Sequence, residues 1–155
     1  MTIDDFKGLM DAFDPASLFP DLDVLIDKIP LIARIAVLIG PVILLVMGLL
    51  YLFASPKEAN YYFGYRCYYG MGSEEAWRYT QRIAGIGLGA LGLVLSVVML
   101  LVSGGFAEME TMDLLWQAVY CVAWEVGLAA VACLTVNTMA ALRFDGKGDR
   151  RKKRR

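Results

Sequence analysis

The chain lacks histidine altogether and has only three cysteines among its 155 residues. Without an imidazole there is no histidine base for acid–base catalysis and no histidine ligand for a metal. Cys67, Cys121 and Cys133 do not show the paired spacing of a metal site or of a disulfide framework. These absences exclude histidine-based catalysis, and we expect no metal site and no cofactor.

Charged residues are scarce in three long apolar stretches, residues 31–53, 83–103 and 114–142. A membrane-spanning helix needs about 20 mostly apolar residues. Inside lipid only a helix or a closed barrel satisfies its own backbone hydrogen bonds. The sequence therefore predicts an all-α membrane protein with three transmembrane helices in one module, residues 30–142.

Lysine and arginine are absent from the short segment 104–112, between the second and third stretches. In contrast, Lys57, Arg66, Arg78 and Arg82 lie between the first two stretches, and residues 150–155 are all basic. Because loops rich in lysine and arginine stay in the cytoplasm, we predict that the N-terminus is outside and the C-terminus inside.

The two ends of the chain differ sharply in charge. Residues 1–29 contain seven aspartates interspersed with apolar residues. This pattern predicts an extracytoplasmic acidic leader, either as short amphipathic helices on the membrane surface or as a loosely ordered segment. Residues 143–155 form a basic cytoplasmic tail that fixes topology and attracts anionic lipid. So short a basic run does not indicate direct binding of nucleic acid.

Tyrosine is concentrated between the first two spans, where residues 55–82 hold six of the eight tyrosines. Tyrosine favours the membrane interface. The glycine within the aromatic string of residues 60–66 also suits a chain that folds back, so we predict an interfacial hairpin on the cytoplasmic side. Arg66 keeps its charge, and its expected partners are Glu74, Glu75, backbone carbonyls or a lipid phosphate.

Two helix starts are predicted in this same segment. Ser55, followed by Pro56 and Glu58, has the features of an N-cap, a first helical position and a capping box. Ser73, followed by two glutamates, suits a second N-cap. From Ser73 we expect one unbroken helix that includes the whole second span.

Small residues follow one face of the second span, at intervals of four, three and four positions. They are Gly85, Gly89, Gly92 and Ser96. Such a stripe lets a neighbouring helix backbone approach closely and indicates a bundle or dimer interface. Trp77 and Gln81 continue the stripe toward the cytoplasm, so we expect both to face protein rather than lipid.

Eight residues after the first span form a recognisable pattern. They are Asn60, Gly64, Tyr65, Arg66, Met71, Glu75, Trp77 and Gln81. Their spacing resembles the signature of the SdpI family of small bacterial integral membrane proteins. The resemblance implies a multi-pass protein of the bacterial plasma membrane. It also implies immunity against a secreted antimicrobial protein, or signalling that holds a cytoplasmic repressor at the membrane, with these eight residues as candidates for partner binding.

Glu125 lies near the middle of the third span. A charged side chain at that depth costs about 2.5–3.5 kcal/mol, so we expect it to face other helices, opposite the glycine stripe. Two interpretations stay open. Glu125 is either a proton- or ligand-coupled group, or a protonated carboxyl that hydrogen-bonds another helix.

Two functions of different classes follow from the sequence. The first is a non-enzymatic immunity or signalling protein that meets a secreted toxin-like protein outside and a repressor inside. The second is a small transporter or lipid-handling subunit that works as a homo-oligomer around Glu125. An enzyme is not expected, because the neighbourhood of Arg66 and Glu75 lacks a nucleophile–base pair.

Overall fold

The computed structural model describes residues 22–59 and 62–151. In chain order it contains α3 (Leu22–Phe53), α4 (Glu74–Val102), the short 3₁₀ helix η1 (Ser103–Glu108) and α5 (Thr111–Arg143). Each long helix is long and apolar enough to cross a membrane, and the described residues contain no β-strand. The prediction of an all-helical protein with three membrane-spanning helices is confirmed. Residues 1–21 of the predicted leader lie outside the described part.

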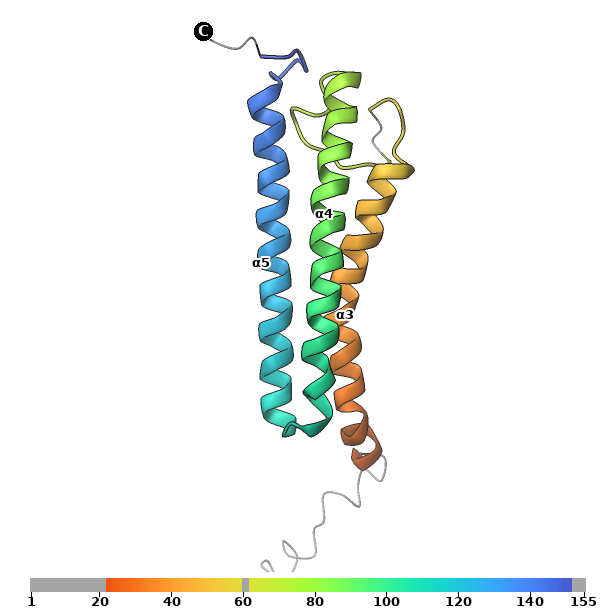
Figure 1. Cartoon of the computed structure of the whole chain (residues 1–155), viewed down its shortest axis with the longest axis vertical. Coiled ribbons are helices and arrows are strands. Elements are labelled where there is room, and N and C mark those ends of the chain that lie inside the picture. The colour runs from red at the N-terminus through yellow and green to blue at the C-terminus, as the bar shows by residue number, and fades with distance from the viewer. Residues whose placement is uncertain (1–21, 60–61, 152–155) are drawn as a thin grey trace, which may run out of the picture.

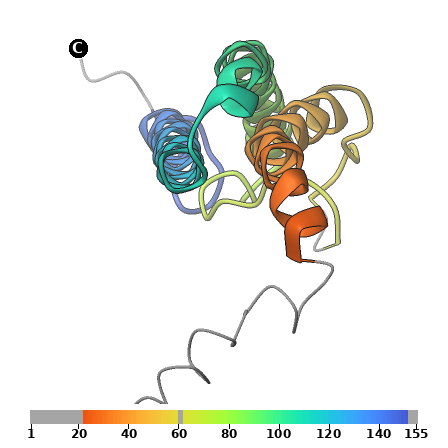
Figure 2. The ribbon, with the colours of Figure 1, turned by 90° about the horizontal axis from the view of Figure 1, so that it is seen from below.

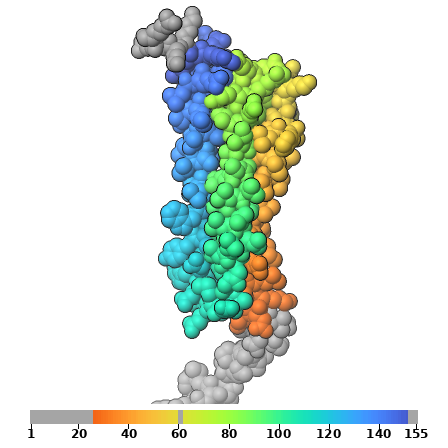
Figure 3. Space-filling view, in the orientation of Figure 1, coloured from red at the N-terminus to blue at the C-terminus, as the bar shows by residue number. Residues whose placement is uncertain are grey.

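The three long helices form a narrow bundle (Figures 1 and 3) in which each helix packs against the other two, most extensively α3 against α4. η1 joins α4 to α5 at one end, which we call the η1 end. The loop between α3 and α4 and the C-terminal residues lie together at the opposite end, which we call the loop end. Viewed along the helices, this loop covers the side of the bundle between α3 and α5 (Figure 2).

The glycine stripe of α4 lies against α3. A Cβ added to Gly48 of α3 would overlap the backbone of Gly89. Gly85 and Gly92, one turn to either side of Gly89, also face α3 so closely that a Cβ there would collide with it. Ser96 donates from its hydroxyl to the Gly92 carbonyl oxygen at 2.7 Å, within its own helix. The small side chains therefore allow two membrane helices to pack backbone against backbone.

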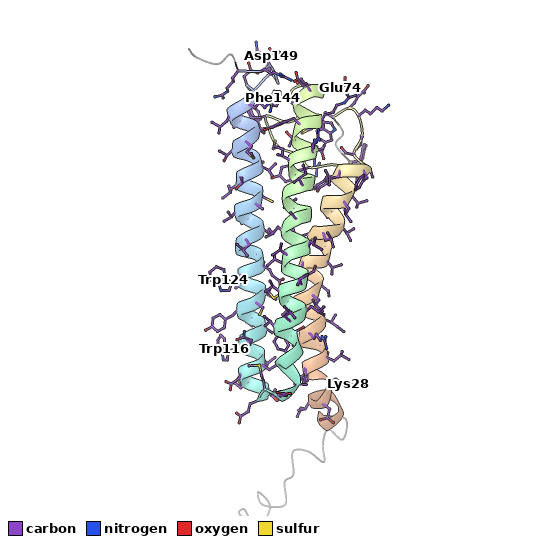
Figure 4. The ribbon with its side chains drawn as sticks, viewed as in Figure 1. Lys28, Glu74, Trp116, Trp124, Phe144 and Asp149 are labelled. Carbon is purple, nitrogen blue, oxygen red and sulfur yellow. The ribbon has the colours of Figure 1, made fainter. Side chains whose placement is uncertain are left out.

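The buried core has two parts. At the η1 end it consists of Ala33, Val37, Leu95, Met99, Phe106, Leu114 and Cys121. At the loop end it consists of Tyr51, Ala84, Leu88 and Val136. α5 contributes fewer buried residues than α4, and its Trp116 and Trp124 point away from the bundle (Figure 4). The outer face of α5 is therefore available to lipid.

One of the two predicted helix starts is wrong. Ser55 and Pro56 follow the end of α3 in a non-helical segment, and neither residue begins a helix. The Pro56 carbonyl instead accepts a hydrogen bond from a side chain of α4. This contact holds residues 54–59 in a non-helical conformation. The start at Ser73 is confirmed, because its side-chain oxygen accepts from the Ala76 N–H at 3.1 Å and α4 runs unbroken from Glu74.

Candidate functional site

The loop between α3 and α4 is fixed to α4 by one side-chain amide. The Tyr65 N–H donates to Gln81 Oε1 at 2.8 Å, and Gln81 Nε2 donates back to the Tyr65 carbonyl oxygen at 2.7 Å. Gln81 is only 2% exposed. A buried backbone group must find a partner, and here a single glutamine supplies both the donor and the acceptor. We call this pair of hydrogen bonds the Gln81 clamp.

Trp77, one turn before Gln81, contacts the same loop at two places, Pro56 and Gly64. It is fully buried, and its indole Nε1 donates to the Pro56 carbonyl oxygen at 2.9 Å. Its ring edge faces Gly64, where an added Cβ would lie 2.6 Å from the Cη2 atom. Gly64 also has a φ of +120°, which residues other than glycine rarely adopt. Both the space and the backbone conformation therefore require glycine at position 64.

The side chain of Tyr65 extends to the third helix. Its hydroxyl lies 3.1 Å from the Cys133 carbonyl oxygen and 3.1 Å from Asn137 Oδ1, both on α5. Its ring packs edge-on against Tyr51 of α3. Burial, followed by the nearby Cys133 thiol, raises the pKa of Tyr65 above its usual range. The neutral hydroxyl thus connects the loop to α5 while the ring contacts α3.

The eight motif residues are not all part of this arrangement. Gly64, Tyr65, Trp77 and Gln81 come together. The other four are Arg66, which is exposed, Met71, which is half-buried in the turn that leads to α4, Glu75, which is exposed on α4, and Asn60, which lies outside the described residues. Half of the motif therefore fixes the loop to α4, and we call these four residues, Gly64, Tyr65, Trp77 and Gln81, the lock.

The two carboxylates expected to pair with Arg66 form salt bridges elsewhere. Glu74 is paired with Arg78, four residues further along α4. Glu75 is paired with Arg150 from the C-terminal segment. The first turn of α4 therefore carries two ion pairs, one within the helix and one to a distant part of the chain.

Comparison with known proteins places this lock in a family. The model of the SdpI/YfhL protein family matches residues 57–137, which is more than half of the 155-residue chain. The chain belongs to the SdpI/YfhL family. It is accordingly a multi-pass membrane protein. No curated protein and no solved structure matches it.

The C-terminal segment of this SdpI-family chain folds back onto the loop end, a contact that the sequence did not predict. Phe144 pairs with Arg150 in an isolated antiparallel bridge and buries its ring against Tyr79. The Ser73 hydroxyl donates to the Gly148 carbonyl oxygen at 2.7 Å while it caps α4. We call residues 144–151 the C-terminal clip. Its only sequence signal is the turn-forming string Asp-Gly-Lys-Gly-Asp.

The turn of the clip is organised by Asp145. Its carboxylate accepts hydrogen bonds from the N–H groups of Lys147 and Asp149, each at 2.9 Å. The backbone hydrogen bond from Asp149 is the largest of several effects that lower the pKa of Asp145. Arg150, which directly follows Asp149, forms the ion pair with Glu75 of α4. The clip is thereby tied to the first turn of α4.

Glu125 lies away from this lock, between the two parts of the core. It is 4% exposed, and its carboxylate is directed at Gly40 of α3, where an added Cβ would lie 2.5 Å from Oε2. The expectation that it opposes the glycine stripe of α4 is wrong, because that stripe is covered by α3. Pro41, next to Gly40, has no N–H, so the Val37 carbonyl of α3 does not receive its usual helical hydrogen bond. Glu125 Oε1 has no hydrogen-bond partner among the described residues.

No cluster of three or more metal-ligating side chains occurs in the described ranges 22–59 and 62–151. The three cysteines have free thiols, one in the loop between α3 and α4 and two on α5. The candidate site is therefore the polar lock at the loop end, and Glu125 is a second, isolated feature inside the membrane-spanning part.

Proposed function

We propose that this SdpI-family chain resides in the bacterial plasma membrane with its loop end in the cytoplasm. Residues 54–59, 62–82 and 143–151 at that end carry eight lysines and arginines, whereas at the η1 end residues 103–113 carry none and the start of α3 carries two, Lys28 and Arg34. The positive-inside rule then assigns the loop end to the cytoplasm. A reporter fused after Tyr69 should be active only inside the cell, and activity only outside would overturn this orientation.

The function we propose is non-enzymatic: immunity or signalling toward a secreted antimicrobial factor, through a cytoplasmic partner such as a repressor. One observation carries the proposal. The loop is joined to α4 by the Gln81 clamp and to α5 by the Tyr65 hydroxyl. A factor that shifts the helices from outside must therefore move the loop, together with its Tyr62 and Tyr68 rings, which are 97% and 75% exposed.

The partner is tested by co-purification from membranes. Protein captured with the wild-type chain is compared with that captured by Arg66→Ala, and Lys147→Ala serves as the control. Both changes remove one positive charge at the loop end, but only Arg66 belongs to the family motif. We expect less of the cytoplasmic partner to be captured with Arg66→Ala than with wild type, and an unchanged amount with Lys147→Ala. Equal recovery from all three forms would argue against a docking surface centred on Arg66.

A second function, a small transporter or lipid-handling subunit that works as an oligomer, is favoured by Glu125. Its buried Oε1 lacks a partner in the described part of the chain. About one turn away, α5 and α3 share an apolar groove of about 570 Å³, which α5 lines with Leu115, Ala118, Val119, Val122 and Ala123. Glu125→Gln should abolish uptake or efflux, whereas Thr138→Val, which affects a hydroxyl bonded within its own helix, should not. Transport unchanged in Glu125→Gln would remove this candidate.

A further inference from the structure

A hollow of about 310 Å³ opens at the loop end between the end of α3 and the first turns of α4. Its size is at the lower limit of ligand pockets, which are typically about 300–1,000 Å³. Three of its lining residues are cations: Lys57 from the loop, and Arg78 and Arg82 from α4. Among the described residues, no acidic one lines it. The hollow therefore combines a concave shape with a positive charge.

The described part of the chain compensates little of this positive charge. Arg78 forms an ion pair with Glu74 at 2.7 Å, but both side chains are more than half exposed, so solvent screens the pair. Neither Lys57 nor Arg82 forms a salt bridge within residues 22–59 and 62–151. Two guanidinium groups and one ammonium group around one hollow match the oxygens of a phosphate, which accept several charge-assisted hydrogen bonds at once.

The position of the hollow selects among phosphate ligands. Arg82 is the last charged residue before the apolar run of α4, and Phe53, 83% exposed, is the last residue of α3. The hollow thus lies where the spans leave the hydrocarbon, at the depth of lipid head groups. Leu52 forms part of its wall and gives an acyl chain an apolar surface next to the cations. A soluble phosphate would make no use of that surface.

We infer that this hollow binds the phosphate head group of an anionic phospholipid. Lys57, Arg78 and Arg82 contact the phosphate oxygens, and Ser55 lies in the same hollow. The bound lipid joins the end of α3 to the start of α4. This assignment does not depend on the cytoplasmic partner proposed above, nor on transport through Glu125.

The test measures lipid retention by the full chain in detergent with native mass spectrometry, using phosphatidylglycerol and phosphatidylcholine of the same acyl chains. Wild type should retain phosphatidylglycerol in preference to phosphatidylcholine. The double variant Lys57→Gln/Arg82→Gln should bind phosphatidylglycerol about tenfold more weakly, since each basic residue near a lipid surface contributes appreciably to anionic lipid binding. Circular dichroism establishes that the variant is folded.

The matched control is Lys147→Gln/Arg151→Gln, which removes the same charge at the same end but outside the hollow. It should weaken phosphatidylglycerol binding far less than the change inside the hollow does, because tail charges attract anionic lipid only from the surface. Equal loss in both double variants, or no lipid preference in wild type, would overturn the assignment. Glycerol 3-phosphate and inorganic phosphate at millimolar concentration form a further arm. If either displaces the lipid from wild type, the hollow is a site for a soluble phosphate and the lipid assignment is wrong.

Discussion

The two ends of the bundle are held together by different forces. At the η1 end, Phe106 and Leu114 are each 1% exposed, and the Ser103 hydroxyl bonds within its own turn, to the Leu100 carbonyl. At the loop end, hydrogen bonds join residues far apart in sequence, such as Tyr65 to Gln81 and Tyr65 to Cys133. Apolar packing is non-directional, whereas hydrogen bonds require one geometry. The positions of the side chains and of the loop are therefore more narrowly defined at the loop end than at the η1 end.

Replacing one glycine at each end should show the contrast most strongly. Gly64→Ala places a Cβ 2.6 Å from the Trp77 ring in a backbone with φ of +120°. Strain of this kind costs about 1–3 kcal/mol, and displacing the packed ring adds to it. Gly105→Ala at the η1 end meets no atom of the described residues within 4 Å. Unfolding by detergent titration, followed by tryptophan fluorescence, should therefore show a large loss of stability for Gly64→Ala only. Equal stability of the two variants would refute the requirement for glycine.

Breaking the Gln81 clamp should have the next largest effect. Gln81→Leu leaves the Tyr65 N–H and carbonyl without their side-chain partners. An unsatisfied buried polar group costs about 1–3 kcal/mol, so the variant should lose stability by an amount in or above that range. Gln117→Leu, in the η1 half of α5, makes the same chemical change and should cost less. The same detergent titration measures both, and a smaller loss for Gln81→Leu than for Gln117→Leu would contradict the clamp.

The Tyr65 hydroxyl should make stability depend on pH in the alkaline range. An unfolded tyrosine ionises near pH 10, while burial raises the pKa of folded Tyr65. As pH rises past about 10, the Tyr65 hydroxyl therefore loses its proton in the unfolded chain before it does so in the folded chain. The free energy of unfolding of the wild type falls as a result. Tyr65→Phe lacks this contribution. At neutral pH it should be less stable by about 1 kcal/mol, the value of one hydrogen bond.

The measurement is the free energy of unfolding of both forms between neutral pH and about pH 11, a range that includes the ordinary tyrosine pKa. The gap between wild type and Tyr65→Phe should narrow as pH rises. Tyr68→Phe, at a side chain that is 75% exposed, serves as the control and should follow the wild-type curve. Parallel curves for wild type and Tyr65→Phe would show that the hydroxyl is not buried against α5.

The helices, and part of the site, could be predicted from the sequence because they depend on local pattern. Apolar runs indicated the three spans, and Ser73 with two following glutamates indicated the start of α4. The spacing that links Trp77 and Gln81 to the glycine stripe predicted that both face protein, and they are 0% and 2% exposed. A periodic pattern reports which face of a helix is buried.

The same pattern does not report which neighbour covers that face. The stripe packs on α3, and Glu125 faces Gly40 rather than the stripe. Likewise, nothing near Gln81 in sequence indicates that its amide holds Tyr65, because the two are 16 positions apart and the contact forms only after the loop folds back. The apparent capping box at Ser55 failed for a related reason, since tertiary contacts of Pro56 outweigh a local helix signal.

The smallest effect should come from the ion pair that ties the C-terminal clip to α4. Glu75 and Arg150 are 53% and 63% exposed, and exposed pairs contribute at most about 1 kcal/mol. Glu75→Gln should therefore speed hydrogen exchange at the Arg151 N–H, which donates to the Arg143 carbonyl, by up to about fivefold. High salt should produce a similar increase in wild type, because it screens the pair. Glu74→Gln removes the neighbouring pair with Arg78 and should leave this exchange unchanged. If Glu75→Gln exchanges at the wild-type rate in low salt, the ion pair does not hold the clip, and the Ser73 hydroxyl and the Phe144 ring do.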